Sequence, residues 1–555
     1  MSDTPKPTAP RVTLHYVADG YDPQIGLNGR RMAGQSFLRA MVEQSRGDLH
    51  AAIRNPADIR RLRSLVSAIA PEKSVNTVME YDRAMRDAGV LMHPGIGVAG
   101  LAWARMTLGQ SSYAICGMTH TLATRMAMGA VAELGYAPIA PWDAVICTSR
   151  AARSMVKAQL EVVADYQRHR FGPDAVKETG PMLPVIPLGI HCADFAPDAG
   201  LRAGLRERLG IADDAILCMV LGRLTIFGKY DPIPLFMAMQ KAADQSGRTL
   251  HLALVGQMPQ GSFADDYNDA ARLMPDVRLH LVDGSAGDMP QAAFSASDIF
   301  VFPIDNLQET FGLAPVEAMA AGLPVVATDW DGLRDTIAPD CGFLVPTMTG
   351  TAAHSLIESR RYHCGTDGEA QFHSLTASMA VFDIEAMASH IARLASDTTL
   401  RKKMGEAAAR RAGQVYDWSV VLPQMQALWA EQARRLATAG PAARQRRENP
   451  MLPSAFGVFR DWPTKRLAAT ALFSAVLGDR LPTVAELSKM RQTDRLKRAL
   501  ETTKLTERVL NQLRATPEPI SAQTLSVRTR LSPLAVERIC LWLAKYGLVR
   551  VDTRG

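Results

Sequence analysis

Two carboxylates, Glu309 and Glu317, stand eight positions apart in the central part of the chain. Glu309 lies in a polar loop just after the apolar run 299–302, and Glu317 falls in the first turns of a predicted helix that begins near Leu313. Between them, the stretch 310–313 predicts a tight turn whose backbone N–H groups lie at a helix N-terminus. Such a terminus attracts anions, because its first N–H groups lack intrahelical partners and the helix dipole adds to them.

This loop therefore offers a carboxylate for sugar hydroxyls, amides for a phosphate and a second carboxylate for a ribose diol. That combination suits a nucleotide-sugar. Two glutamates at this spacing also occur by chance in long chains, so the interpretation depends on the elements around them. The residues expected to bind the nucleotide-sugar here are Glu309, Thr310, Phe311, Gly312, Leu313 and Glu317.

The context of the pair is a strand, a loop, Pro315, an Ala/Gly-rich helix and the apolar strand 324–328. Here the sequence resembles the retaining glycosyltransferases of family 4, whose signature is this pair of glutamates with seven residues between them. The run Glu-Ala-Met-Ala-Ala-Gly-Leu-Pro-Val-Val-Ala at 317–327 extends the match. Across roughly residues 10–435, the resemblance implies an α/β GT-B fold, in which two Rossmann-like, doubly wound domains face a cleft.

The elements that must position these residues alternate between strands and helices, which is typical of a doubly wound parallel sheet. Ligands of such sheets gather at the carboxyl ends of the strands. The predicted domains are an acceptor-side Rossmann-like domain (1–195), a nucleotide-sugar-binding domain with a crossover helix from Trp418 (196–436), a linker (437–464) and a basic, all-helical, winged-helix-like domain (465–555).

Two cations, Arg223 and Lys229, follow the continuous apolar run 215–221, which predicts a strand buried on both faces. Two cations at a strand end can neutralise a diphosphate by charge-assisted hydrogen bonds. They can also stabilise the charge that develops on a departing phosphate. A lone pair of cations is more often a solvated surface. The resemblance makes these two the expected diphosphate clamp, and catalytic residues together with Glu309.

His120 follows the predicted strand 112–117, so a neutral imidazole there could exchange a hydrogen bond with a substrate hydroxyl. The resemblance implies that it contacts the donor sugar near its reacting centre and is a catalytic residue. A helix-capping histidine is the alternative. His93 is a second histidine at such a position, although its turn could be pure architecture.

A glycine-bearing loop follows the first predicted strand, 12–17, and contains Gly26 and Gly29. Glycines let a ligand approach the backbone closely. The loop is similar to the one that touches donor phosphate in the family, so Gly26 and Gly29 are expected donor contacts. It lacks the family's usual adjacent glycine pair, and a plain flexible loop is the alternative.

The resemblance implies a hexosyl-type transfer that retains anomeric configuration, by same-face attack in which the leaving phosphate takes the acceptor's proton. No Asp-x-Asp metal triad is required in this fold, so neither a metal nor a cofactor is expected. A saccharide or lipid-linked acceptor in polysaccharide biosynthesis is the usual role of such enzymes, and neither donor nor acceptor is identified by the sequence. A phosphorylase or sucrose-synthase-like enzyme shares the carboxylate pair and is an alternative.

Composition is that of a globular protein: 47% of the 555 residues are apolar and 21% are charged. The longest apolar stretches are far shorter than the roughly 20 residues of a membrane span. Seven cysteines lack paired spacing, which favours neither a disulfide framework nor a zinc site. A cytoplasmic location is expected, with at most peripheral contact at the inner face of the cytoplasmic membrane.

The tail is basic, with 21 Lys and Arg against 10 Asp and Glu in residues 441–555, a net of +11. It shows helical patterns at 465–477, 483–500 and 504–515, and then a pattern similar to a winged helix-turn-helix. In that pattern Ser521 and Ser532 would cap two helices, and the second would be the recognition helix.

That second helix is mostly apolar, which favours a protein-interaction or homo-oligomerisation module over nucleic acid or a membrane surface. Phosphate contacts on DNA would use Arg528, Arg530, Arg538 and Lys545. A DNA-binding regulator that senses a nucleotide-sugar is therefore the alternative to an enzyme. The complete set of cleft residues favours the enzyme, because a sensor need not keep them all.

Overall fold

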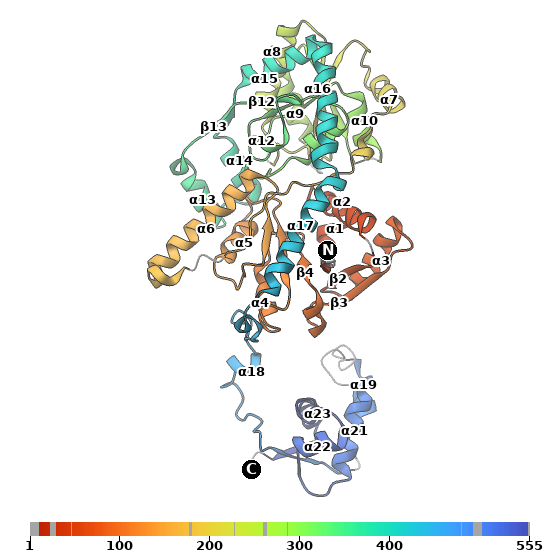
Figure 1. Cartoon of the computed structure of the whole chain (residues 1–555), viewed down its shortest axis with the longest axis vertical. Coiled ribbons are helices and arrows are strands. Elements are labelled where there is room, and N and C mark those ends of the chain that lie inside the picture. The colour runs from red at the N-terminus through yellow and green to blue at the C-terminus, as the bar shows by residue number, and fades with distance from the viewer. Residues whose placement is uncertain are drawn as a thin grey trace, which may run out of the picture. The chain divides into compact units, whose positions relative to one another are not determined.

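The structure is a computed structural model, drawn as a cartoon in Figure 1. It describes residues 10–22, 29–45, 47–176, 180–226, 228–258, 263–285, 287–478, 480–491 and 502–552. Residues 1–451 form one compact unit, and residues 452–555 form a second one.

The first domain is built on a six-stranded parallel sheet in the order β3-β2-β1-β4-β5-β6. Its strands are β1 (Val12–Tyr16), β2 (Leu49–Ile53), β3 (Val75–Met79), β4 (Val90–Met92), β5 (Ala114–Met118) and β6 (Ala144–Ile146). Its longer helices are α2 (Gly29–Gln44), α3 (Asp58–Ile69), α4 (Ala99–Met106), α5 (Arg125–Leu134) and α6 (Arg150–Phe171). The order reverses beside β1, so the loops after β1 and β4 border a switch point, where ligands bind in such sheets.

The second domain repeats this plan with the strand order β12-β11-β10-β7-β8-β9. Its strands are β7 (Ile216–Leu221), β8 (Leu250–Gly256), β9 (Val277–Asp283), β10 (Ile299–Phe302), β11 (Val325–Thr328) and β12 (Gly342–Val345). Its helices are α7 (Ala199–Leu209), α8 (Pro232–Ser246), α9 (Ala264–Ala270), α10 (Met289–Ala296), α11 (Leu313–Ala320), α12 (Leu333–Thr336), α15 (Ile384–Ser396) and α16 (Thr398–Arg411). The central strands β8, β10 and β11 are buried throughout, as their apolar runs predict.

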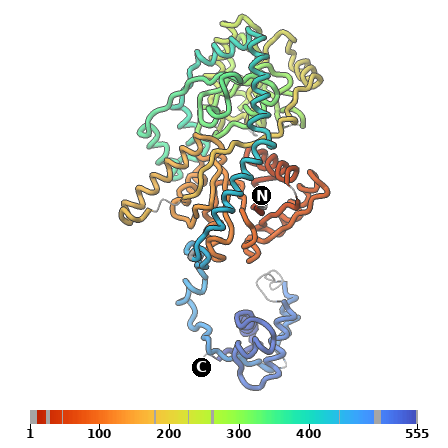
Figure 2. The backbone as a smooth tube through the Cα atoms, viewed as in Figure 1, coloured from red at the N-terminus to blue at the C-terminus, as the bar shows by residue number. Residues whose placement is uncertain are grey.

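Helix α17 (Trp418–Ala437) carries the chain back from the second domain to the first. Figure 2 shows this teal-to-blue segment lying along the red and orange first domain. The Trp418 indole donates to the Ser36 hydroxyl at 2.7 Å, and the Gln432 amide donates to the Ile115 carbonyl at 2.9 Å. The crossover helix expected from Trp418 is therefore confirmed, and it fastens the two domains together.

An insertion of about thirty residues lies between the strands β13 (Thr347–Thr349) and β14 (Ala380–Phe382) of the second domain. It contains α13 (Leu356–His363) and α14 (Glu369–Ala377). The Tyr362 hydroxyl accepts a hydrogen bond from the Arg125 backbone N–H at 2.8 Å, at the start of α5. The insertion thus adds a second link between the two domains.

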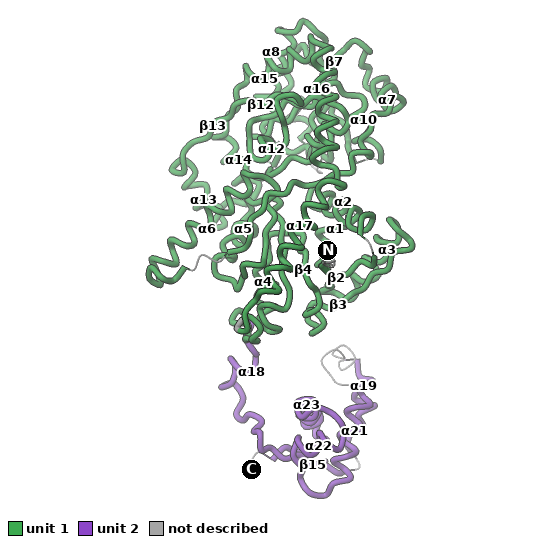
Figure 3. Tube along the Cα trace, in the orientation of Figure 1, with its two compact units in different colours: residues 1–451 green, residues 452–555 purple. Residues whose placement is uncertain are grey.

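The second unit (purple in Figure 3) has its own apolar core. It consists of β15 (Leu472–Ala475), α19 (Val484–Lys489), α21 (Thr503–Arg514), β16 (Ile520–Ser521), α22 (Ala522–Thr529), α23 (Pro533–Lys545) and β17 (Val549–Asp552), preceded by the short α18 (Ala455–Val458). Ser521 and Ser532 cap α22 and α23 through their side chains, as predicted.

One prediction for this unit is wrong. The segment 465–477 contains the strand β15 rather than a helix, and β15 pairs antiparallel with β16 and with β17. Leu472 and Phe473 face partners on both neighbouring strands, and Phe473 is buried in the core. Tertiary pairing therefore overrides the local helical pattern. No helix in the described part of the chain is long and apolar enough to cross a membrane.

Candidate active site

Glu309 and Lys229 meet at the carboxyl end of the second sheet. Glu309 follows β10 and Lys229 lies in the loop after β7, and these two strands are neighbours in the sheet. The Lys229 Nζ lies 3.1 Å from Glu309 Oε2, and the two side chains are 24% and 18% exposed. A salt bridge that remains partly exposed can exchange one of its partners for a ligand.

The second carboxylate oxygen of Glu309 is held by the turn that precedes α11. Its Oε1 accepts a hydrogen bond from the Gly312 backbone N–H at 3.0 Å. Burial opposes ionisation, but the charge of Lys229 and the hydrogen bonds from Lys229 and the turn outweigh it and lower the pKa of Glu309. The carboxylate is therefore ionised at neutral pH. The Gly312 amide, one of the turn amides expected from the sequence to bind a phosphate, therefore donates to the Glu309 carboxylate instead.

The turn itself depends on Gly312, which has a φ of +86°. An L-residue rarely adopts this left-handed conformation, and a Cβ at this position would lie 2.7 Å from the Leu333 side chain. The neighbouring Phe311 is buried and packs edge-on against Tyr416, 5.9 Å between ring centroids. Thr310 donates from its hydroxyl to the His120 carbonyl at 3.0 Å. These contacts fix the loop rather than leaving it open.

Glu317 lies on α11 (Leu313–Ala320), which begins directly after the turn. Burial raises the pKa of Glu317 to about 7. Within the described residues its side chain has neither a hydrogen bond nor an ion pair, so it is available to a diol. Arg223 is exposed just beyond β7, and its carbonyl accepts from the Thr225 backbone N–H at 3.0 Å.

On the first domain, His120 lies just after β5 and touches the Glu309 loop through the backbone bond to Thr310. Burial and the nearby Arg30 lower the pKa of His120 to about 4, which keeps the imidazole neutral. Gly29 is the first residue of α2. Gly26 lies outside the described residues.

Three side chains in contact at the ends of β1, β3 and β4 form a chain that the sequence reasoning missed. His15 Nδ1 lies 2.7 Å from His93 Nδ1, and His15 Nε2 lies 3.5 Å from Glu80 Oε1. Burial opposes the ionisation of Glu80, but bonds from His15 and Arg54 outweigh it and lower its pKa to about 2. An ionised Glu80 favours a proton on His15 Nε2, so His15 Nδ1 accepts from His93 Nδ1–H. The remaining His93 nitrogen, Nε2, is then an acceptor.

His93 Nε2 faces the same space as Arg30. A Cβ placed on Gly95 would lie 3.4 Å from His93 Nε2 and 3.8 Å from the Arg30 guanidinium. Burial lowers the pKa of His93 to about 3, so its ring is neutral. The sequence could have indicated this contact, because one histidine lies in β1 and another lies directly after β4, and these two strands are neighbours in the sheet.

Asp331 is a further carboxylate that sequence reasoning missed. It has a φ of +40°, and its Oδ1 accepts from the Leu333 backbone N–H at 3.1 Å. Its other oxygen is buried without a hydrogen-bond partner in the described structure. Burial and the charge of Glu309 raise the pKa of Asp331 well above its usual range. A protonated carboxyl beside Glu309 could donate a hydrogen bond to a ligand.

The comparisons with known proteins place the second domain in context. Residues 216–358 match the family model described as "Glycosyl transferases group 1". The D-inositol 3-phosphate glycosyltransferase of Stackebrandtia nassauensis is 30% identical over 203 residues, which is 35% of this chain and 42% of that protein. The protein of the same name from Kineococcus radiotolerans is 30% identical over 253 residues, covering 40% of this chain and 54% of its own length. The chain thus spans about half, or less, of the length of these two relatives.

The architecture has its own counterpart among solved structures. A glycosyltransferase from Rickettsia africae superposes with a TM-score of 0.50 at 12% identity, over 78% of this chain and all of that one. This likeness shows the fold, two parallel six-stranded sheets with flanking helices. The chain therefore has a GT-B architecture, and over residues 216–358 it is similar to the group 1 glycosyl transferases.

Proposed function

We propose that this protein transfers a sugar from a nucleotide-sugar to an acceptor, with retention of anomeric configuration. The observation that carries the proposal is the Lys229–Glu309 pair, 3.1 Å apart at the carboxyl end of the sheet, with Glu317 about one turn into α11 and without a partner among the described residues. The family match over 216–358 and the curated relatives, which are named as glycosyltransferases, support it.

In this proposal the donor diphosphate lies between Arg223 and Lys229, where the two cations neutralise it without a divalent ion. Lys229 then turns from Glu309 toward the phosphate, and Glu309 accepts hydrogen bonds from sugar hydroxyls. Glu317 accepts from the ribose diol. As the bond to the anomeric carbon breaks, negative charge grows on the departing phosphate, and the two fixed cations stabilise it.

The acceptor enters from the first domain, where His93 Nε2 lies near Arg30 and the neutral His120 adjoins the Glu309 loop. Its hydroxyl attacks the anomeric carbon on the face that the phosphate leaves, and its proton passes to the leaving phosphate oxygen. The two histidines orient the hydroxyl. The acceptor class that we propose is a saccharide or a lipid-linked saccharide, because the site needs only a hydroxyl nucleophile.

The test is turnover of a panel of nucleotide-sugars by the wild-type protein and by Glu309→Gln and Arg223→Gln. Each variant should lower kcat/KM by about 10–100-fold, since a charge-assisted hydrogen bond contributes about 1.5–3 kcal/mol. Glu385→Gln is the matched control, because Glu385 pairs with Lys241 at 2.6 Å in an exposed salt bridge elsewhere. Equal turnover in all four proteins contradicts the proposal, and the anomeric configuration of the product, read by NMR, tests retention.

A further inference from the structure

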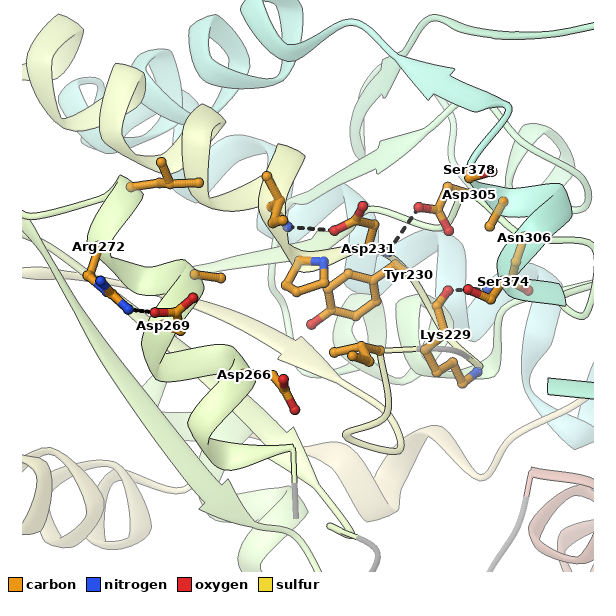
Figure 4. A pocket seen from close by; sticks show the side chains of 16 residues that line it. Lys229, Tyr230, Asp231, Asp266, Asp269, Arg272, Asp305, Asn306, Ser374 and Ser378 are labelled. Atoms are coloured by element: carbon orange, nitrogen blue, oxygen red, sulfur yellow. Dashed lines mark hydrogen bonds and ion pairs between the residues drawn. The ribbon is translucent and has the colours of Figure 1, made fainter. Parts of the chain in front are cut away.

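A cavity of about 600 Å³ lies behind the loop that carries Lys229 (Figure 4). The segments that line it are the loop after β7 with the start of α8, the helix α9 with the turn that follows, the loop after β10, and the end of α14. A volume of this size is typical of sites for small organic molecules. None of the residues assigned to the donor lines it except Lys229.

Two buried polar atoms on the cavity wall, one each from Asp305 and Tyr230, have no hydrogen-bond partner among the described residues. Asp305 is 5% exposed, and its Oδ2 accepts from the Asp231 backbone N–H at 3.0 Å, but its Oδ1 bonds to nothing in the described structure. Tyr230 is also 5% exposed, and its hydroxyl likewise has no partner among the described residues. Leaving such a group unsatisfied costs about 1–3 kcal/mol, so a ligand that bonds to it regains that free energy.

The cavity carries an excess of negative charge. Asp231, Asp266 and Asp305 line it, and none of the three forms an ion pair with the residues that the structure describes. At the rim, Asp269 is neutralised by Arg272. The only other cation on the wall, Lys229, is paired with Glu309. The cavity therefore repels phosphates and attracts a cation, in contrast to the donor cleft beside it.

The cation that fits is organic rather than a metal ion. Among the described residues, no group of three or more His, Cys, Asp and Glu side chains is close enough together to hold a metal. The wall also includes Ile226, Leu273 and Ala377, which can cover the carbon skeleton of a ligand. Such a wall adds apolar burial to the charge attraction.

We propose that this cavity binds a small organic molecule through a primary ammonium group. The ammonium donates to Asp305 Oδ1, and the carbon skeleton lies against the apolar part of the wall. Aliphatic diamines and amino sugars share this chemistry. The site does not depend on the proposed transferase activity.

The position of the cavity gives a ligand there a route to the donor site. The Asn306 side-chain amide, on the loop that continues to Glu309, donates to the Lys229 carbonyl. Asp305 holds the loop after β7 through the Asp231 backbone N–H. A ligand bonded to Asp305 therefore contacts both of the loops that present Lys229 and Glu309.

The test is calorimetric titration of the full chain near pH 7.5, since burial raises the pKa of Asp305 to about 7 and the ammonium needs it ionised. The probes are 1,5-diaminopentane against 1,5-pentanediol, and glucosamine against glucose. At least one amine should bind once per chain, tenfold or more tightly than its neutral counterpart, and the tighter amine identifies the source. No binding by either amine, or equal binding of an amine and its neutral counterpart, overturns the proposal.

Variants locate the site. Asp305→Asn keeps an acceptor for the Asp231 N–H and removes the charge, so it should weaken amine binding at least tenfold. Asp265→Asn is the matched control, because Asp265 precedes Asp266 on α9, is exposed and does not line the cavity. If Asp305→Asn does not fold, Asp266→Asn is the replacement variant, because Asp266 lines the cavity and is exposed. It should weaken amine binding several-fold. Wild-type affinity in a folded Asp305→Asn or Asp266→Asn protein overturns the assignment.

Discussion

At the scale of single residues, Lys229 and Glu309 act as one unit. Their salt bridge is partly exposed, so its own contribution to stability is small, of the order of 0–1 kcal/mol. The salt bridge instead fixes the orientation of the Glu309 carboxylate, because Lys229 donates to one of its oxygens and the Gly312 amide donates to the other. The carboxylate therefore keeps its orientation in the absence of a ligand.

Glu317 gives donor binding a pH dependence. Its pKa is raised to about 7, so it is mostly neutral at pH 6 and ionised at pH 8. A ribose diol bonds more strongly to the ionised form, so the KM for the donor should fall several-fold between pH 6 and pH 8. In Glu317→Gln this part of the pH profile should be flat. If Glu317→Gln keeps the wild-type dependence of the donor KM on pH, the titrating group is another residue.

The His93–His15–Glu80 chain predicts a defect confined to the acceptor. His93→Ala removes the proposed acceptor contact and should slow transfer about tenfold, the effect of one or two neutral hydrogen bonds, while hydrolysis of the donor by water stays unchanged. Glu80→Gln should give a smaller loss of the same kind, because it weakens the tautomer preference of His15. His169→Ala, an exposed histidine on α6, is the control. Equal losses of hydrolysis and transfer point to a purely structural role.

At the scale of elements, the junction between β10 and α11 decides the geometry of the site. Gly312→Ala forces an L-residue to a φ of +86°, which costs about 1–2 kcal/mol. The variant should melt at a lower temperature and lose turnover, because the amide that holds Glu309 shifts. Gly204→Ala is the matched control: it lies exposed in α7 with open space around it, and there alanine should be neutral or slightly stabilising. A Gly312→Ala protein with wild-type melting and turnover contradicts this account.

The same junction shows how an element far along the chain supports the loop. The Tyr416 hydroxyl donates to the Asp335 carbonyl at 3.1 Å, and its ring packs on Phe311. Arg411 donates to the Thr336 carbonyl at 2.9 Å. The end of α16 and the segment after it therefore brace the turn of the Glu309 loop, just before the chain crosses to the first domain.

At the scale of the whole molecule, the division after Met451 predicts an independent catalytic unit. Residues 438–451 belong to the first unit and pack on its first domain, since the Ser111 N–H donates to the Ala443 carbonyl and the Arg447 N–H to the Met106 carbonyl, both at 3.0 Å. A chain ending at Met451 should therefore keep the wild-type melting temperature and turnover. A chain ending at Ala437 should melt lower, because it lacks these bonds. Loss of turnover in the chain that ends at Met451 would show that the second unit takes part in the reaction.

For the second unit we propose a role in protein contact or self-association. Leu534 and Leu541, on the predicted recognition helix α23, are 66% and 45% exposed, and Val527 on α22 is 73% exposed. Apolar side chains in these positions offer few hydrogen bonds to base edges. The proposal keeps the role separate from the chemistry of the first unit.

The sequence alone determined the elements that depend on local pattern. Continuous apolar runs indicated the buried strands β7 and β10, and the loops that follow them, which carry Arg223 and Glu309, start at the carboxyl ends by chain order alone. Serine caps and the start of α17 were also readable, because capping and helical periodicity involve only residues a few positions apart.

Tertiary structure decided what depends on contacts between distant residues. Only folding brings His15 to His93, raises the pKa of Asp331 through burial and the charge of Glu309, or turns Glu309 onto the Gly312 amide that was expected to bind a phosphate. It also made a strand of 472–475, whose partners lie about fifty and eighty residues further on. Pairing, burial and charge proximity are properties of three-dimensional distance, and no short window of sequence contains them.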